Sequence, residues 1–253
     1  MGSPPKIEIQ NGIVLIGSDL HIWPGTESTT LRAFKKFCKE LKPAAVILNG
    51  DVLDFPQISR HPPMGWETIP SPFEEIEAAQ LHLHEIEQAA PRGCRKIWTL
   101  GNHDARFEAR LAAVAKEYKN IKGLHLWEHF NSCWQRGWSC WINSDVLVKH
   151  RFKGGVHASY NNVLHAGCTI VTGHLHSASV RQFTDSRGQR WGVDTGCMAE
   201  TDHPAFEYCE DNPRNWVSAF GVFTFKDGRL LWPELVTKHS ADEMQWRGKI
   251  IRV

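Results

Sequence analysis

The sequence is poor in the features that mark secreted and membrane proteins. Its seven cysteines, in 253 residues, include no Cys-x-x-Cys pair. An odd count without such pairs argues against a disulfide framework or a structural zinc ribbon, so we expect reduced, mostly buried thiols. Residues 1–10 hold two prolines and no apolar run of signal-peptide length, and runs such as 13–16 and 44–48 are too short to span a membrane. We therefore expect a cytoplasmic protein.

An excess of charge of either sign is also lacking. Lys and Arg total 29, Asp and Glu total 28, and the formal net charge is +1. So balanced a chain has no global field that draws it to nucleic acid or membrane, although local patches can still act. Its 253 residues, 42% of them hydrophobic, are enough to bury a core. With no internal repeat or break in composition, we expect a single domain over residues 1–253.

The first half of the chain alternates between strand and helix signals. Apolar runs at 13–16, 44–48 and 95–100 predict buried strands, and segments 28–41, 73–90 and 105–117 predict helices. Such alternation is typical of parallel strands with helices packed on the faces of the sheet. The proline-rich segment 55–72 predicts a long loop and is a candidate lid over a site.

The second half consists mostly of predicted strands, with one helix expected near 157–165. Turn residues at 185–188 and 226–228 predict hairpins. Two sheets packed together and flanked by helices fit this pattern best. The predicted strands cover 138–142, 146–150, 169–173, 178–183, 190–194, 219–225 and 229–236.

Polar groups suited to metal ligation follow five of the predicted strands. Each group alone is better explained by a turn carboxylate, a helix cap or a structural histidine. Ligands of parallel sheets bind at the carboxyl ends of the strands, so these groups can together form one binding site. Carboxylate, amide and imidazole without thiolate suit manganese, iron or zinc more than calcium, and are numerous enough for two ions with a shared ligand. The groups are Asp19 and His21; Asp51; Asn102, His103 and Asp104; His150; and His174 and His176.

In order and spacing, this set resembles the calcineurin-like metallophosphoesterase family over roughly residues 13–200. The resemblance implies an α/β fold, a four-layer α/β/β/α sandwich with two mixed sheets. It also implies two divalent metal ions, with manganese expected before iron, zinc, nickel or cobalt. The motifs that carry it are Asp19-x-His21, Gly50-Asp51, Gly101-Asn102-His103-Asp104, His150 and Gly173-His174-x-His176.

The resemblance also implies a role for each residue. Asp51 would bridge the ions, and His103 would contact a phosphoryl oxygen or protonate the leaving group, with Asp104 orienting its ring. The family often has glycine after the isolated metal histidine, but Arg151 follows His150 here, which makes His157 a rival ligand. We prefer His150, because a buried strand delivers it to the expected edge. One ion would be held by Asp19, His21 and His176, and the other by Asn102, His150 and His174.

The implied reaction is phosphoester hydrolysis by in-line attack of metal-activated hydroxide. We expect a phosphodiesterase acting on nucleotides or nucleic acid. Arg151 and Arg181 are the expected contacts to further phosphates, and Trp23 and His61 to a base, although a solvated basic face explains the arginines equally well. A phosphomonoesterase, acting on nucleotides or proteins, is the alternative within the same class. A non-catalytic scaffold on this fold is a further alternative, against which every expected ligand position is filled.

Overall fold

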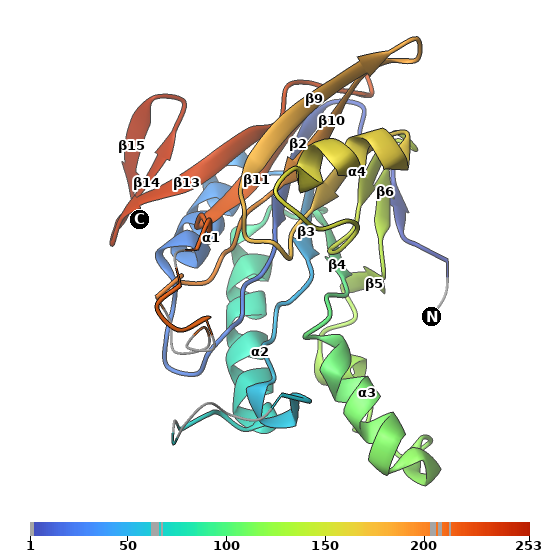
Figure 1. The fold of residues 1–253 in the computed structure, drawn as a ribbon, viewed down its shortest axis with the longest axis vertical. Coiled ribbons are helices and arrows are strands. Elements are labelled where there is room, and N and C mark those ends of the chain that lie inside the picture. Colours follow the sequence, from blue (N-terminus) through green and yellow to red (C-terminus); the bar gives the residue numbers. More distant parts are fainter. Residues whose placement is uncertain (1–2, 62–65, 67, 203–205, 207–208, 213) are drawn as a thin grey trace.

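The structure is a computed structural model that describes residues 3–61, 66, 68–202, 206, 209–212 and 214–253 (Figure 1). The two longest helices in this part of the chain begin at capping residues. Ser28 Oγ accepts a hydrogen bond of 3.0 Å from Leu31 N, and Ser71 forms a capping box with Glu74. The α-helices are α1 (Thr29–Leu41), α2 (Pro72–Ala89), α3 (Ala105–Val114) and α4 (Ala158–Ala166).

The larger sheet carries the alternating first half of the chain. Its centre is the parallel run β2-β3-β4-β5, and β11 pairs with β2 in the antiparallel sense. The described strands follow the order β15-β14-β13-β11-β2-β3-β4-β5, with β12 beside β11. Their bounds are β2 (Gly12–Gly17), β3 (Ala45–Asn49), β4 (Arg95–Thr99), β5 (Trp134–Gly137), β11 (Ala219–Lys226), β12 (Arg229–Leu230), β13 (Glu234–Ser240), β14 (Glu243–Trp246) and β15 (Lys249–Arg252).

The smaller sheet is built mainly from the second half of the chain, with the order β1-β6-β7-β8-β10-β9 among the described residues. It is also mixed: β7, β8 and β10 run parallel, whereas β9 and β10 form an antiparallel hairpin. Its strands are β1 (Lys6–Ile7), β6 (Cys140–Ile142), β7 (Val146–Val148), β8 (Thr169–Thr172), β9 (Ser179–Asp185) and β10 (Gly188–Asp194).

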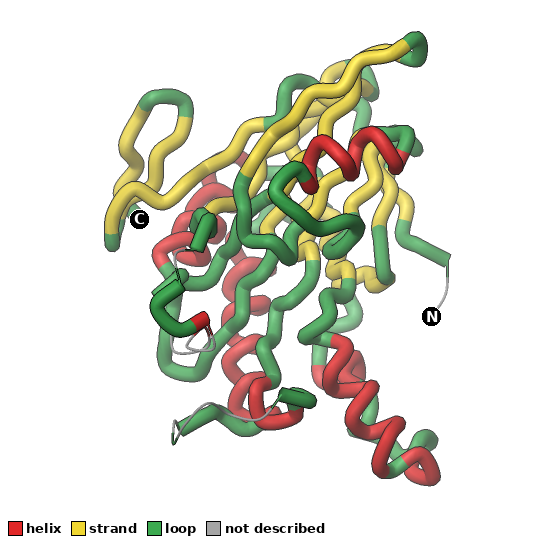
Figure 2. Tube along the Cα trace, viewed as in Figure 1, coloured by secondary structure: helices red, strands yellow, loops and turns green. Residues whose placement is uncertain are grey.

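The layers follow from the alternation of side chains along each strand. In β2, Leu15 packs toward α1 and α2, while Val14 and Ile16 pack between the two sheets. On the outer face of the smaller sheet, α4 lies against β8, β9 and β10, as Figure 2 shows in red over yellow. The expected four-layer α/β/β/α sandwich with two mixed sheets is confirmed. By contrast, α3 extends away from both sheets (Figure 1) and buries none of its residues.

Several expected boundaries differ from the observed ones. The segment 229–236 forms two strands, β12 and β13, rather than one, and Pro233 lies between them. The helix expected over 105–117 ends at Val114 and is followed by a 3-10 turn, Lys116–Tyr118. The candidate lid 55–72 includes residues 62–65 and 67, which lie outside the described residues, and it contains a short 3-10 helix, Pro56–Ile58. All seven cysteines are described and free, as expected.

Both sheets end in loops that carry the candidate ligands. Strands β2, β3 and β4 are adjacent and parallel, and so are β7 and β8, so their carboxyl ends reach the same edge. The two sheets are joined there, because His174 N donates to Asp19 Oδ2 at 2.9 Å and His150 Nδ1 to Asn49 O at 2.7 Å. No helix in the described part of the chain is both long and apolar enough to cross a membrane.

Candidate metal centre

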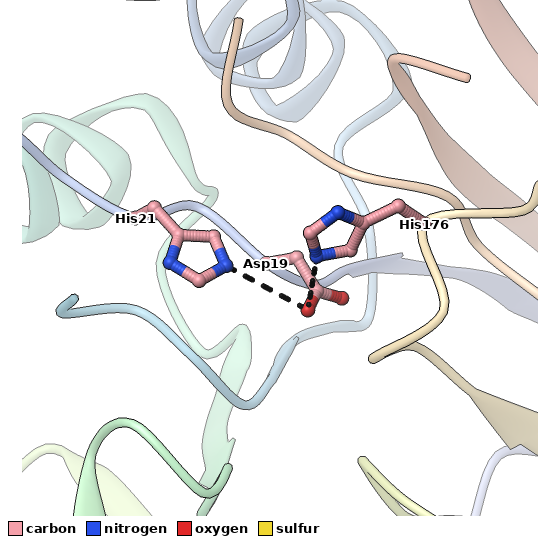
Figure 3. Close-up of side chains that lie close together, drawn as sticks. All are labelled: Asp19, His21 and His176. Carbon is pink, nitrogen blue, oxygen red and sulfur yellow. Dashed lines mark hydrogen bonds and ion pairs between the residues drawn. The ribbon is translucent and has the colours of Figure 1, made fainter. Parts of the chain in front are cut away.

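One group of candidate ligands joins the loop after β2 to the loop after β8. His176 Nε2 lies 3.1 Å from Asp19 Oδ1, and His21 Nε2 lies 3.9 Å from the same oxygen (Figure 3). All three side chains are buried, and one ligand atom from each residue lies within 4.8 Å of the ligand atoms of the other two. A carboxylate facing two imidazoles from separate loops is a geometry that suits a single divalent cation.

A second group lies beside the first. His150 Nε2 is 3.0 Å from Asp51 Oδ2 and 3.9 Å from Asp19 Oδ1, so His150 links the two groups. His174 completes this group, with its ligand atom within 4.8 Å of those of Asp51 and His150. The structure therefore brings together six of the seven residues that the resemblance divided between two ions, all except Asn102.

The hydrogen bonds of two histidines leave a ring nitrogen free for a cation. His150 Nδ1 donates to Asn49 O at 2.7 Å, because a carbonyl oxygen can only accept. His21 Nδ1 pairs with Asp54 Oδ1 at 2.8 Å. In each ring Nε2 remains for ligation, an arrangement typical of metal-binding histidines.

Four buried polar atoms at this centre have no hydrogen-bond partner among the described residues. Buried groups of this kind are nearly always paired, so such a cluster requires an explanation. Cations bound among the ligands would satisfy His21 Nε2, Asn102 Oδ1 and His150 Nε2, whereas His176 faces Asp19 with Nε2 and not with Nδ1. The oxygen and nitrogen donors fit divalent ions such as manganese, iron or zinc. The atoms are His21 Nε2, Asn102 Oδ1, His150 Nε2 and His176 Nδ1.

The electrostatic field of the centre is also that of a cation site. Burial opposes a charge on His150, but Asp51 and Asp19 outweigh it and raise its pKa to about 10. Burial raises the pKa of Asp19, and His176 and His150 more than reverse this, so it stays below the usual range. Burial and the charge of His150 lower the pKa of His174 to about 4, which keeps that ring neutral. The carboxylates thus hold positive charge at this place, and a divalent cation can replace the proton.

The backbone at the centre is held in an unusual conformation. Asp19, His21, Asp51, His174 and His176 all have positive φ, between 40° and 72°. This left-handed region is costly for residues other than glycine, and such residues cluster where a site requires them. Glycines allow the close approach of these loops: a Cβ at Gly101 would lie 2.0 Å from Asp51 Oδ1, and one at Gly173 would lie 2.5 Å from Asp19 Oδ2.

His103 lies next to the two groups and outside both. Its Nε2 is 4.0 Å from Asp51 Oδ2, and its Nδ1 is 2.8 Å from Asp54 Oδ1. Arg106 Nη2 approaches Nε2 at 3.2 Å. A guanidinium only donates, so in this arrangement Nε2 accepts and Nδ1–H donates to Asp54. Burial lowers the pKa of His103, but Asp51 and Asp54 outweigh burial and raise it.

The expected role of Asp104 is wrong. Its carboxylate does not contact the His103 ring but binds the loop that carries Asp51. Oδ2 accepts from Asp51 N, Gly101 N and Trp98 Nε1 at 2.9–3.1 Å, and Oδ1 accepts from Val52 N and Leu53 N at 3.0 and 3.1 Å. The reason is that α3 starts at Ala105 and turns the preceding side chain back toward the end of β3. Asp54, not Asp104, orients His103.

Asp54 and its support by Glu75 were missed from the sequence. Asp54 Oδ1 contacts both His21 and His103, so it couples a candidate ligand to the candidate acid. Glu75 Oε2, on α2, accepts from Asp54 N at 3.0 Å and Phe55 N at 2.8 Å. The spacing Gly50-Asp51-x-x-Asp54 was visible in the sequence, but nothing there showed that two rings meet on one oxygen.

The remaining predicted residues lie at or beyond the edge of the centre. Arg151 is exposed next to His150, and its charge helps to lower the pKa of His174, after burial and His150. His157 is exposed and is not in either ligand group. Arg181 and His61 are exposed, and none of their hydrogen bonds or ion pairs within the described part of the chain reaches the ligands. Trp23 lines a small pocket that also includes His21.

Two aromatic side chains that the sequence did not single out pack on the first ligand group. The ring of Trp216 lies 4.4 Å from that of His176, and Phe206 lies 5.1 Å from His21 and 5.6 Å from His176. Phe206 is almost fully buried. These rings form an apolar wall that limits access of water to the histidines from this side.

Comparison with known sequences identifies the family. The model of the family described as calcineurin-like phosphoesterase matches residues 13–191, which is more than half of the chain. The gene 54 protein of Mycobacterium phage D29 is 25% identical over 88% of this chain and 92% of its own length. The gene 54 protein of Mycobacterium phage L5 is 23% identical over 92% of this chain and 98% of its own length.

Solved structures of Vps29 resemble the chain more distantly. Wild-type Vps29 complexed with zinc from Entamoeba histolytica is 14% identical, with a TM-score of 0.47, over 95% of this chain and 98% of that one. Vps29 from Chaetomium thermophilum is 10% identical, with a TM-score of 0.45, over 95% of this chain and 96% of that one. At these values, no statement about activity passes from these proteins to this chain.

Proposed function

This chain belongs to the calcineurin-like phosphoesterase family, and we propose that it is a phosphodiesterase that uses two divalent metal ions to hydrolyse nucleotides or nucleic acid. Family membership supports the coarser part of this statement, a metal-dependent phosphoester hydrolase. The number of ions, the diester preference and the substrate class are our proposal.

The observation that carries the proposal is the pair of adjoining ligand groups. His150 Nε2 lies 3.0 Å from Asp51 Oδ2 and 3.9 Å from Asp19 Oδ1, so one imidazole spans both groups. We assign Asp19, His21 and His176 to one ion, Asn102, His150 and His174 to the other, and Asp51 to both. Manganese is the metal we expect first, with iron, zinc, nickel or cobalt as alternatives.

Residues at the centre would have separate roles in hydrolysis. When bound, the two ions would activate a water nucleophile and neutralise charge on the phosphoryl oxygens. His103 would contact a phosphoryl oxygen or protonate the leaving group, because it is the histidine beside the groups that belongs to neither. Asp54 would fix the orientation of its ring through the 2.8 Å contact with Nδ1. Asp104 would hold the Asp51 loop through its backbone amides.

A diester is our first choice because an exposed cation, Arg151, adjoins the second ligand group. It follows His150 directly, and no ion pair joins it to an acid in the described part of the chain. Such a cation can bind a further phosphate of a nucleotide or of a nucleic acid. Arg181 remains a proposed contact to a further phosphate, and Trp23 and His61 remain proposed contacts to a base.

Rates on paired substrates test the proposal. The manganese-loaded protein should hydrolyse bis(p-nitrophenyl) phosphate faster than p-nitrophenyl phosphate, since both release the same leaving group. A screen of nucleotides, cyclic nucleotides and short DNA then identifies the natural class. A preference for the monoester would support the alternative, a phosphatase acting on nucleotides or proteins. Metal binding without hydrolysis of either ester would support a non-catalytic scaffold.

A further inference from the structure

Arg106 is a cation at the edge of the metal centre, where its charge acts on the carboxyl group of Glu75 without a direct ion pair in the described part of the chain. Several other arginines are paired with acids, for example Arg247 with Glu234 at 2.6 Å. Within the described residues, no carboxylate oxygen forms an ion pair with Arg106. Its guanidinium instead uses two neutral acceptors, Asp54 O at 2.7 Å from Nη1 and His103 Nε2 at 3.2 Å from Nη2.

The guanidinium is also held in place. Arg106 lies in the first turn of α3, where its backbone N donates to His103 O at 2.9 Å. The same residue therefore contacts His103 through its backbone and its side chain, and Asp54 through its side chain. Groups fixed on a helix in this way are suited to precise positioning of a ligand.

A short path leads from this cation to the expected position of the substrate. Nη2 of Arg106 is 3.2 Å from His103 Nε2, which is 4.0 Å from Asp51 Oδ2. A phosphoryl group bound to ions held by Asp51 would come within reach of the guanidinium. Arg106 is only partly buried, so a ligand can reach it.

We propose that Arg106 binds a non-bridging oxygen of the substrate phosphoryl group, on the side of His103. This inference rests on the proposed function and adds a residue to it. An anionic oxygen is a stronger acceptor than a neutral ring nitrogen, and the guanidinium has donors to spare for a two-point contact. On binding, Nη2 exchanges His103 Nε2 for the phosphoryl oxygen, which leaves Nε2 free to face the leaving group.

The competing explanation is that Arg106 only braces the Asp54 loop through the Asp54 carbonyl. Inorganic phosphate separates the two, because it carries the phosphoryl oxygens without requiring turnover. The comparison uses Arg106→Ala and Arg106→Lys in the full chain. Arg110→Ala is the matched control, since Arg110 lies one turn further along α3, is exposed and has no charged partner in the described residues.

The experiment measures phosphate binding to the manganese-loaded proteins by calorimetry, with metal content and urea unfolding recorded for each. We expect Arg106→Ala to keep its metal and to bind phosphate about 10- to 100-fold more weakly, as for a lost charged hydrogen bond. Arg106→Lys should recover part of this affinity, and Arg110→Ala should bind as the wild type does. In steady state, Arg106→Ala should also raise KM for the diester.

Phosphate affinity in Arg106→Ala equal to that in Arg110→Ala, with metal content intact, would overturn the inference and leave a bracing role. Should Arg106→Ala fail to fold, equal phosphate affinity in Arg106→Lys and wild type would overturn it as well. Failure of the proposed function is seen separately, as a wild-type protein that binds no manganese or hydrolyses no phosphoester.

Discussion

Replacing Gly50 by alanine is expected to displace His150 and weaken metal binding. A Cβ at Gly50 would lie 2.5 Å from Cγ and Nδ1 of the His150 ring. Carbon atoms in contact normally stay about 3.5–4.0 Å apart, so the ring must move by about 1 Å or more. That movement strains the 2.7 Å hydrogen bond from His150 Nδ1 to Asn49 O, which orients the ring.

The loss of stability in Gly50→Ala has two contributions, backbone conformation and steric clash, and substitution of Gly93 separates them. Gly50 has φ +84°, so alanine there adds about 1–2 kcal/mol for the left-handed conformation. The clash with a packed ring adds about 1–3 kcal/mol, which gives about 2–5 kcal/mol in all. Gly93 has nearly the same φ, +87°, but a Cβ there would meet nothing within 4 Å. Gly93→Ala should therefore lose only about 1–2 kcal/mol.

Urea unfolding of the two variants gives the loss of stability, and a manganese titration gives the affinity. Gly50→Ala should bind its more weakly held manganese about 10- to 100-fold less tightly, the range typical of a disturbed ligand orientation. Gly93→Ala should bind manganese as the wild type does. Equal stability and equal metal affinity in both variants would refute the claim that His150 is a ligand held by close packing on Gly50.

Three further changes separate the roles of neighbouring groups. His103→Ala should keep both ions by elemental analysis while turnover falls about 10²–10⁴-fold; full turnover would exclude its catalytic role. Asp104→Asn turns an amide NH₂ toward backbone donors, so urea unfolding should show a loss of about 2–5 kcal/mol, and unchanged stability would contradict its role in holding the Asp51 loop. Burial, aided by Asp54, raises the pKa of Glu75 to about 8. The folded state therefore holds a proton that the unfolded chain loses near pH 4.5. The free energy of unfolding should fall as the pH rises from about 4.5 to 8. Between pH 5 and 8.5, the free energy of unfolding of Glu75→Gln relative to that of the wild type should rise by about 2–4 kcal/mol. Parallel pH profiles of stability for the two proteins would contradict this.

The central strands were predictable because their sequence signal and their environment agree. Residues 13–16 and 44–48 are apolar without interruption, and both faces of β2 and β3 are covered. The edge strands were less visible. The segment of β5, Trp134–Gly137, has no apolar run and no alternation, and β15 has mostly exposed residues. Such strands form because a neighbour offers backbone hydrogen bonds, which a local pattern does not record.

The candidate ligands were predictable for a related reason. A strand that ends in glycine and a polar residue carries its ligand locally, and parallel topology brings these ends together. The contacts of Asp54, Asp104 and Arg106 depend instead on side-chain direction after a loop or in the first turn of a helix. Asp104 precedes α3 and turns back to the Asp51 loop, whereas Arg106 turns toward His103. No residue spacing distinguishes these directions.

Anomalous diffraction from crystals grown with manganese tests the account most directly. If the proposed dinuclear centre is correct, we expect two peaks about 3.5–4 Å apart, with Asp51 contacting both. Asp19, His21 and His176 should surround one peak, and Asn102, His150 and His174 the other. A single peak, or manganese bound away from Asp51, would contradict the dinuclear centre on which the proposed reaction depends.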